Sequence, residues 1–141
     1  MPDKTLTPSG ILHVSPFKQD HDYLRGIFGG KVEWNLNYAS TLRSGLEVAT
    51  QDQMVVVICE AELPDGDRGG DWRDLLQGLA KLPKPPLLIV VSNLADEKLW
   101  GEVLNRGGYD VLMKPFNTIE VRRAVALARL HWDNLGQSKR T

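Results

Sequence analysis

The chain has 141 residues, of which 25% are charged, and a formal net charge of −1. This length allows one domain to bury a core of its own, and the near-neutral charge argues against binding to nucleic acid or to a membrane surface. The single cysteine, Cys59, excludes a disulfide framework, and the absence of an apolar run of ~18 residues or of a signal peptide predicts a cytoplasmic protein.

Apolar runs alternate with amphipathic segments along the chain, which is typical of an α/β protein with a parallel sheet. We predict strands near residues 11–14, 31–36, 55–60, 87–91 and 110–113. We predict helices near residues 20–28, 40–50, 72–79, 96–106 and 118–133. Asp96 is expected to cap the fourth helix, and Gly107 and Gly108 are expected to end it.

Five strand–helix units joined by right-handed crossovers predict a doubly wound, flavodoxin-like five-stranded parallel sheet in a three-layer sandwich. The domain is expected to span residues 10–133. Residues 1–9 are expected to form an N-terminal extension, and residues 134–141 a flexible tail.

Three polar side chains stand at or just past the ends of predicted buried strands. The acid Glu60 ends the third strand, the hydroxyl of Ser92 follows the fourth, and Lys114 follows the fifth. Ligands of doubly wound folds bind outside the carboxyl ends of the strands. We therefore expect these three side chains to converge on one pocket.

The same positions carry a resemblance to the receiver domain of two-component response regulators, over about residues 10 to 132. Its most specific part is the run Gly107–Phe116, with the sequence GGYDVLMKPF, which resembles the family's passage from the fourth helix to a lysine-proline-phenylalanine turn. Glu60 with the following Leu63, Pro64 and Gly66 resembles the phosphoacceptor strand and its loop. Val90-Val91-Ser92 resembles the strand that ends in the switch hydroxyl.

The resemblance implies a phosphorylation site from which this chain departs. In the family an aspartate accepts a phosphoryl group from a histidine kinase, two acids after the first strand help to bind Mg²⁺, and an aromatic of the fifth strand turns inward. Here Glu60 stands at the aspartate position, Ser15 and Pro16 at the acidic pair, and Val111 at the aromatic. The family's lysine and hydroxyl are both present in this chain, as Lys114 and Ser92.

These departures predict that Mg²⁺ binds weakly or not at all and that no other cofactor is used. Mg²⁺ prefers carboxylate and other oxygen ligands in octahedral geometry, whereas Ser15 offers one neutral oxygen and Pro16 none. Glu60 is also longer than aspartate by a methylene, on the order of 1.5 Å, and a shift of ~1 Å can cost ~100-fold in a positioned reaction. The longer side chain could instead reach Lys114 and Ser92 and hold the domain in one state.

Other polar residues near these strand ends have simpler interpretations. Glu62 could add charge to the pocket but is more simply a solvated acid. Asp20 is expected to cap the first helix, which argues against a metal cluster of Asp20, His21 and Asp22. His13 lies inside an apolar strand and is expected to be packed rather than catalytic.

The last two helices carry wide apolar stripes. Trp100 and Trp132 are most simply core residues, whereas Leu99, Leu127 and Leu130 are candidates for an interface with a protein partner. The resemblance implies that this face could support a homodimer. The alternative is that these leucines only cover a well-packed helix.

We therefore expect a stand-alone atypical receiver of bacterial signalling that is not an enzyme. It would act by contact with proteins, such as a histidine kinase or a downstream regulator, without the usual Mg²⁺-dependent phosphorylation. One alternative is a phosphorylatable phosphorelay intermediate, in which Asp20 or Glu62 rescues metal binding. Another is a flavodoxin-like module that binds a small ligand, although the loops lack the Ser, Thr and Gly-rich phosphate cradle that such a module needs.

Overall fold

The computed structural model describes residues 8–63 and 70–138 of the chain. The strands are β1 (Ser9–Val14), β2 (Trp34–Ala39), β3 (Val56–Glu60), β4 (Leu87–Ser92) and β5 (Asp110–Met113). The helices are α1 (Lys18–Phe28), α2 (Leu42–Gln51), α3 (Trp72–Leu79), α4 (Glu97–Asn105) and α5 (Thr118–Ser138). The predicted alternation of strands and helices is confirmed.

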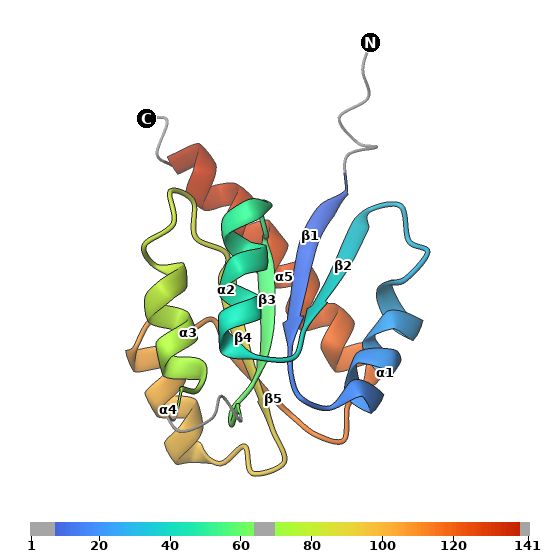
Figure 1. Ribbon diagram of the computed structural model, residues 1–141, viewed down its shortest axis with the longest axis vertical. Helices are drawn as coiled ribbons and strands as arrows, with labels where there is room; N and C mark the ends of the chain where they lie inside the picture. The colour runs from blue at the N-terminus through green and yellow to red at the C-terminus, as the bar shows by residue number, and fades with distance from the viewer. Residues whose placement is uncertain (1–7, 64–69, 139–141) are drawn as a thin grey trace.

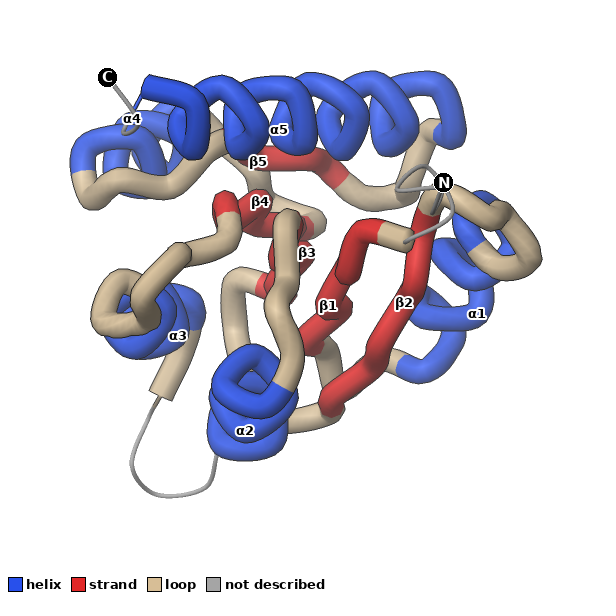
Figure 2. Tube along the Cα trace, turned by 90° about the horizontal axis from the view of Figure 1, so that it is seen from above, coloured by secondary structure: helices blue, strands red, loops and turns tan. Residues whose placement is uncertain are grey.

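The strands form one parallel sheet in the order β2-β1-β3-β4-β5, as expected for a doubly wound, flavodoxin-like fold. Helices cover both faces of the sheet in a three-layer arrangement (Figures 1 and 2). Helices α1 and α5 lie on one face, and α2 and α3 lie on the other. The carboxyl ends of all strands meet at one edge, because the strands are parallel.

Side-chain alternation along each strand supplies a separate core to each face. Val57 and Cys59 of β3 belong to the cluster shared with α2, α3 and Val103 of α4, whereas Val56 and Ile58 belong to the cluster shared with α1 and α5. The central strands β1, β3 and β4 are buried almost throughout, which explains their continuous apolar runs.

Several predicted boundaries differ from the structure. Strand β2 begins at Trp34 rather than Lys31, because residues 31–33 form a turn that the backbone N–H of Trp34 closes by donating to Lys31 O. Helix α5 continues past Asp133 to Ser138, so most of the predicted tail is helical. The remaining tail residues, 139–141, lie outside the described residues.

The predicted ends of helix α4 are confirmed. The Asp96 carboxylate caps the helix by accepting a hydrogen bond from the backbone N–H of Leu99, and Gly107 ends it with a φ of 103°. Among the described residues, no helix is both long and apolar enough to cross a bilayer.

Candidate functional site

The ammonium group of Lys114 lies between two carboxylates at the carboxyl edge of the sheet. Its Nζ is 2.8 Å from Glu60 Oε1 and 2.7 Å from Asp20 Oδ2. It also lies 4.5 Å from the centre of the Phe17 ring, within the range of a cation–π contact. The predicted approach of Glu60 and Lys114 is therefore present, with Asp20 and Phe17 completing the site.

The fold brings these residues together from distant parts of the sequence. Glu60 is the last residue of β3, Lys114 follows the last residue of β5, and Asp20 lies in the first turn of α1. Alternation places Glu60 on the same face of the sheet as Ile58, which is the face that α1 covers. The long side chain of Lys114 can therefore reach both acids.

The charged side chains of this cluster are largely buried, which carries a desolvation penalty. The side chains of Lys114 and Glu60 are each 9% exposed, and that of Asp20 is 23% exposed. Burial raises the pKa of the Glu60 carboxyl, and the hydrogen bond from Lys114 opposes this rise. Burial lowers the pKa of Lys114, but its hydrogen bonds to Asp20 and Glu60 outweigh that effect and raise the pKa overall.

Asp20 has a different role from the one predicted. Helix α1 begins at Lys18, its N-cap is Phe17, and no side chain caps the helix. The Asp20 carboxylate is therefore not the cap but an ion-pair partner of Lys114. An acid in the first helical turn is also favoured by the helix dipole.

The loop at Ser15 and Pro16 is bonded within the protein. Ser15 is fully buried, and its hydroxyl accepts a hydrogen bond from the backbone N–H of Phe17 at 3.0 Å. The Tyr38 hydroxyl donates to Ser15 O at 2.7 Å. Both oxygens of Ser15 are therefore engaged in fixing the loop, while the pyrrolidine ring of Pro16 offers no ligand atom.

Ser92 is oriented differently from the expected third member of the pocket. Its hydroxyl accepts a hydrogen bond from the backbone N–H of Leu94 at 3.0 Å. Alternation along β4 places it on the face of Leu88 and Val90, opposite the face that carries Glu60. Ser92 therefore serves the turn toward α4, and the described contacts of Lys114 go to Glu60, Asp20 and Phe17 instead.

Two further residues of the predicted site, Glu62 and Val111, have different environments. Glu62 is exposed, and its charge contributes to raising the pKa of Glu60. Val111 is buried and packs with the cluster on the α2 and α3 face of the sheet. The predicted switch position therefore holds a small core side chain.

A second polar cluster adjoins the site on the α1 side. His13 is buried, and its Nδ1 lies 3.2 Å from His21 Nδ1, so one of the two nitrogens carries the shared hydrogen. The His21 ring stacks on Tyr38, with 4.2 Å between the centroids. Burial, assisted by the charges of His21 and Lys114, lowers the pKa of His13 to about 3. His13 is thus packed, as predicted, and its lowered pKa favours the neutral ring.

The predicted interface residues have unequal environments. Leu127 and Leu130 are exposed, whereas Leu99 is partly buried and packs against the core, so it offers less surface to a partner than the other two. Trp100, predicted as a core residue, is instead 48% exposed, while Trp132 is partly buried. The helix turns Leu99 inward and its neighbour Trp100 outward.

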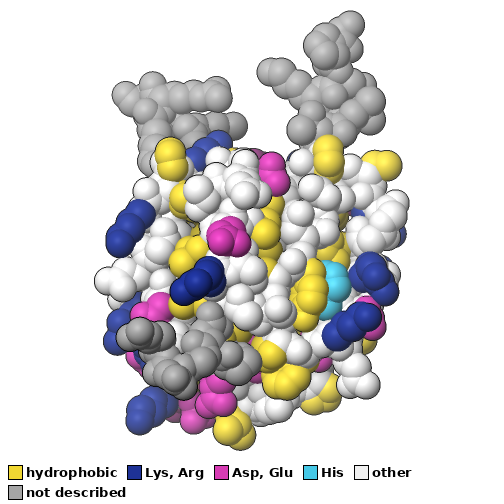
Figure 3. Space-filling model, in the orientation of Figure 1, with side chains coloured by type: hydrophobic (Ala, Val, Ile, Leu, Met, Phe, Trp, Pro, Cys, Tyr) yellow, Lys and Arg dark blue, Asp and Glu magenta, His cyan; other side chains and the backbone are white. Residues whose placement is uncertain are grey.

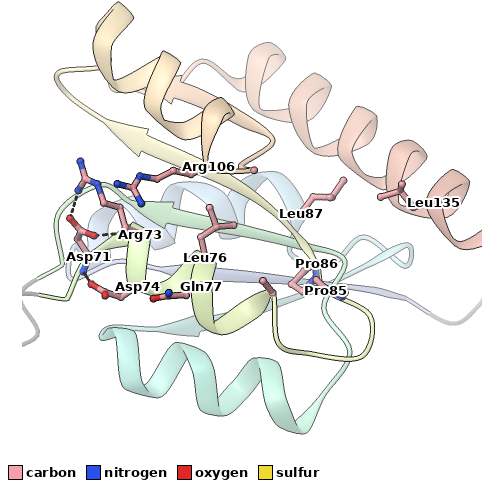
Figure 4. Close-up of a pocket in the computed structure, with 12 residues that line it drawn as sticks. Asp71, Arg73, Asp74, Leu76, Gln77, Pro85, Pro86, Leu87, Arg106 and Leu135 are labelled. Atoms are coloured by element: carbon pink, nitrogen blue, oxygen red, sulfur yellow. Dashed lines mark hydrogen bonds and ion pairs between the residues drawn. The ribbon is translucent and has the colours of Figure 1, made fainter.

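A hollow of about 960 Å³ extends along α3, between this helix, the end of α4, α5 and the start of β4 (Figure 4). Its polar end contains Arg73 and Arg106, and both of them bind Glu102. Its other end includes Leu87 and Leu135. The Arg73–Glu102 pair joins α3 to α4. Among the described residues, no group of three or more His, Cys, Asp or Glu side chains is placed to hold a metal ion.

Comparisons with known proteins identify the fold. The signal receiver domain of an HD domain-containing protein from Pseudomonas fluorescens is 22% identical, with a TM-score of 0.82 and 97% of each chain covered. A CheY-like receiver domain protein from Methanospirillum hungatei is 21% identical, with a TM-score of 0.76 over 90% of this chain and 98% of that chain. The beryllofluoride-activated NtrC4 receiver domain dimer is 18% identical, with a TM-score of 0.77 over 87% of this chain and 98% of that chain.

No protein-family model and no curated protein matches the sequence. The likeness therefore concerns the fold, which is the flavodoxin-like fold of CheY-like receiver domains. The structural neighbours are response regulator receiver domains, one of them a two-component response regulator from Clostridium difficile.

Proposed function

We propose that the protein is an atypical receiver that signals by protein contact in a cytoplasmic, bacterial two-component pathway, without Mg²⁺-dependent phosphorylation. The observation that carries this proposal is the double ion pair of Lys114 with Glu60 and Asp20. A receiver lysine contacts an incoming phosphoryl group, and here that positive charge is already neutralised by two carboxylates of the chain itself.

The donor atoms at the edge of the sheet do not fit Mg²⁺. The carboxylates of Glu60 and Asp20 both bind Lys114, and the Ser15 hydroxyl accepts from the backbone of Phe17. Mg²⁺ requires several oxygen ligands in near-ideal octahedral geometry, usually with carboxylates among them. Assembling such a site would require breaking the ion pairs that hold Lys114.

A domain that does not accept a phosphoryl group at this site would act through contact with other proteins. Exposed apolar side chains on α4 and α5, among them Trp100, Leu127 and Leu130, provide a surface for a kinase, a downstream regulator or a second copy. The face formed by α2 and α3 carries its apolar atoms in small separate groups (Figure 3).

The test is incubation with acetyl phosphate and Mg²⁺, followed by intact-mass spectrometry. We expect no added phosphate on the wild type, and the same result for the Glu60→Gln variant, which serves as the control for labelling elsewhere. A stoichiometric, base-labile phosphate that the wild type takes up and Glu60→Gln does not would refute the proposal. It would favour the second candidate, a phosphorelay intermediate in which Asp20 supplies the missing metal ligand.

A further inference from the structure

A small hollow lies toward the edge of the sheet opposite to the Lys114 cluster. It has a volume of about 310 Å³ and lies between the end of α1, the start of β2 and α5. Because the strands are parallel, the start of β2 lies at the edge where all strands begin. We call this space the Trp34 hollow, after the first residue of β2, which lines it.

The floor of the Trp34 hollow is apolar and held by the core. Ile27 and Phe28, the last two residues of α1, line it and are buried. The rings of Phe28 and Trp34 pack edge to face, with 5.9 Å between their centroids and 72° between their planes. Trp34 is only partly buried, so part of its indole is available to a ligand.

The turn that carries one side of the rim is fixed by its own backbone. The N–H of Lys31 donates to Phe28 O at 3.2 Å, and the N–H of Trp34 donates to Lys31 O at 3.3 Å. Gly30 has a φ of 79°, which a residue with a side chain rarely adopts. Lys31 and Glu33 are therefore placed at the hollow before any ligand binds, which lowers the cost of binding.

The charges around the hollow are mainly positive. Lys31 and Arg122 line it, and the guanidinium of Arg129 lies 5.4 Å from the centre of the Trp34 ring. The acid that lines it is Glu33. In the part of the chain that the structure describes, none of these four charged side chains has an ion-pair partner. Three cations and one acid leave an excess of positive charge that an anion would balance.

This combination of groups selects the chemistry of a ligand. Lysine and arginine bind phosphate by charge-assisted hydrogen bonds. Glu33 would repel a bare polyanion, but a carboxylate accepts hydrogen bonds from ribose hydroxyls, as an acid does in dinucleotide-binding folds. An apolar floor suits a flat ring. Pockets for small ligands have volumes of about 300–1,000 Å³, so a hollow of about 310 Å³ suits a mononucleotide.

We propose that the Trp34 hollow binds a nucleoside mono- or diphosphate. Lys31 and Arg122 hold the phosphate, Glu33 accepts hydrogen bonds from the ribose, and the base packs against Phe28 and Trp34. The site shares no residue with the Lys114 cluster. It therefore goes beyond the proposed function and does not depend on it.

The test is isothermal titration calorimetry of the whole chain with ADP. We expect one saturable site with a dissociation constant below about 1 mM. Adenosine lacks the phosphates, and pyrophosphate lacks the ribose and the base. Each of them should bind at least about tenfold more weakly than ADP, because each loses one of the two sets of contacts.

Two neighbouring arginines of α5 provide a matched pair of variants. Arg122 lines the Trp34 hollow, whereas Arg123 lines a different hollow beside β5. Arg122→Ala should raise the dissociation constant of ADP by at least about tenfold, the cost of losing a hydrogen bond to a charged group. Arg123→Ala should leave this constant unchanged. Both side chains are exposed, so both variants should keep the fold.

Two further variants separate a nucleotide from a plain anion. Glu33→Ala should weaken the binding of ADP, because the ribose loses its acceptor, and should strengthen the binding of pyrophosphate, because a repelling charge is removed. ADP should change the tryptophan emission of the wild type and of Trp100→Phe, whose tryptophan lines the hollow beside β5. It should not change the emission of Trp34→Phe.

Three results would overturn the inference. They are no binding of ADP at millimolar concentration, pyrophosphate that binds as tightly as ADP, or equal binding of ADP by Arg122→Ala and Arg123→Ala. The second result would leave a plain anion-binding surface, and the third would place ADP elsewhere on the protein. The labelling of Glu60 by acetyl phosphate tests the proposed function separately, whichever result ADP gives.

Discussion

Replacing Lys114 with methionine should destabilise the protein far more than removing the charge of Glu60. Lys114→Met leaves Glu60 with no cation in a site where its side chain is only 9% exposed. Removing one partner of a buried ion pair costs about 3–5 kcal/mol. We expect the lower end, about 3 kcal/mol, because Asp20 is 23% exposed and can be hydrated by surrounding water.

Glu60→Gln should cost less than about 1 kcal/mol, because Lys114 keeps Asp20 and the burial penalty of one carboxylate disappears. The double variant Lys114→Met with Glu60→Gln should recover most of the loss, since it contains no unpaired buried charge at this position. Lys98→Met removes an exposed lysine of α4 and should change stability by less than about 0.5 kcal/mol.

Urea denaturation followed by tryptophan fluorescence measures these differences, with the fully buried Trp72 as a reporter of the core. With a slope of about 2 kcal/mol per molar urea, a loss of 3 kcal/mol lowers the midpoint by about 1.5 M. The reasoning is refuted if Glu60→Gln costs as much as Lys114→Met, or if the double variant is as unstable as Lys114→Met alone.

The pH dependence gives a second check on the same variant. Burial raises the pKa of Glu60, and loss of Lys114 removes the contact that opposes this rise. A carboxyl whose folded pKa exceeds its unfolded value destabilises the fold as pH rises above the unfolded value, near 4.3. The deficit of Lys114→Met should therefore be largest at pH 7 and should shrink toward pH 4. A deficit that does not vary with pH would show that lost packing, not the unpaired charge, causes it.

Glu60→Asp alone should show neither Mg²⁺-dependent tryptophan quenching nor labelling by acetyl phosphate. The triple change Ser15→Asp, Pro16→Asp and Glu60→Asp should recover Mg²⁺ binding, because only this variant supplies three acids at the site. Robust labelling of the single variant would show that the metal has another ligand. His13, with its pKa lowered to about 3, should stay neutral in NMR titrations down to about pH 4. Stability should accordingly fall as pH drops from about 6.5 toward 3, because the unfolded chain takes up a proton there that folded His13 does not. An NMR midpoint above pH 5 for His13 would contradict this.

The central part of the fold could be predicted because its strands are buried on both faces. Strands β3, β4 and β5 lie within a residue of their predicted bounds, since a buried parallel strand is a nearly continuous apolar run. The edge strand β2 begins and ends three residues later than the sequence predicts. Its sequence alternates, and the exposed Val32 extends that alternation into a turn.

The sequence predicts only part of the candidate site. Parallel topology predicts that Glu60 and Lys114 lie at the same edge of the sheet, because both stand at strand ends. The role of Asp20 depends on where helix α1 begins, and the backbone sets that start at Phe17, a residue without a capping side chain. A charged residue in the first turn of the helix after β1 was the available signal. The sequence pattern predicts a cap at Asp20, whereas the structure makes this residue a partner of Lys114.

The sequence pattern does not determine the direction in which a side chain points. Leu99 and Trp100 are adjacent on a wide apolar stripe, and only the packing of α4 decides which of them faces inward. Ser92 similarly lies at a strand end, but its hydroxyl bonds to the turn at Leu94. Periodicity identifies the apolar stripe of a helix or the residues at a sheet edge, whereas tertiary contacts determine which of these residues lie in one site.

The double pairing of Lys114 has a consequence for how such a protein could carry information. If the site takes up no phosphoryl group, as we propose, each molecule has the same state from synthesis to degradation. Apart from the occupancy of the Trp34 hollow, the quantity left to vary is the number of molecules in the cell. We would therefore look for regulation in transcription, in proteolysis and in competition for a shared partner, where the ratio of copies sets the response.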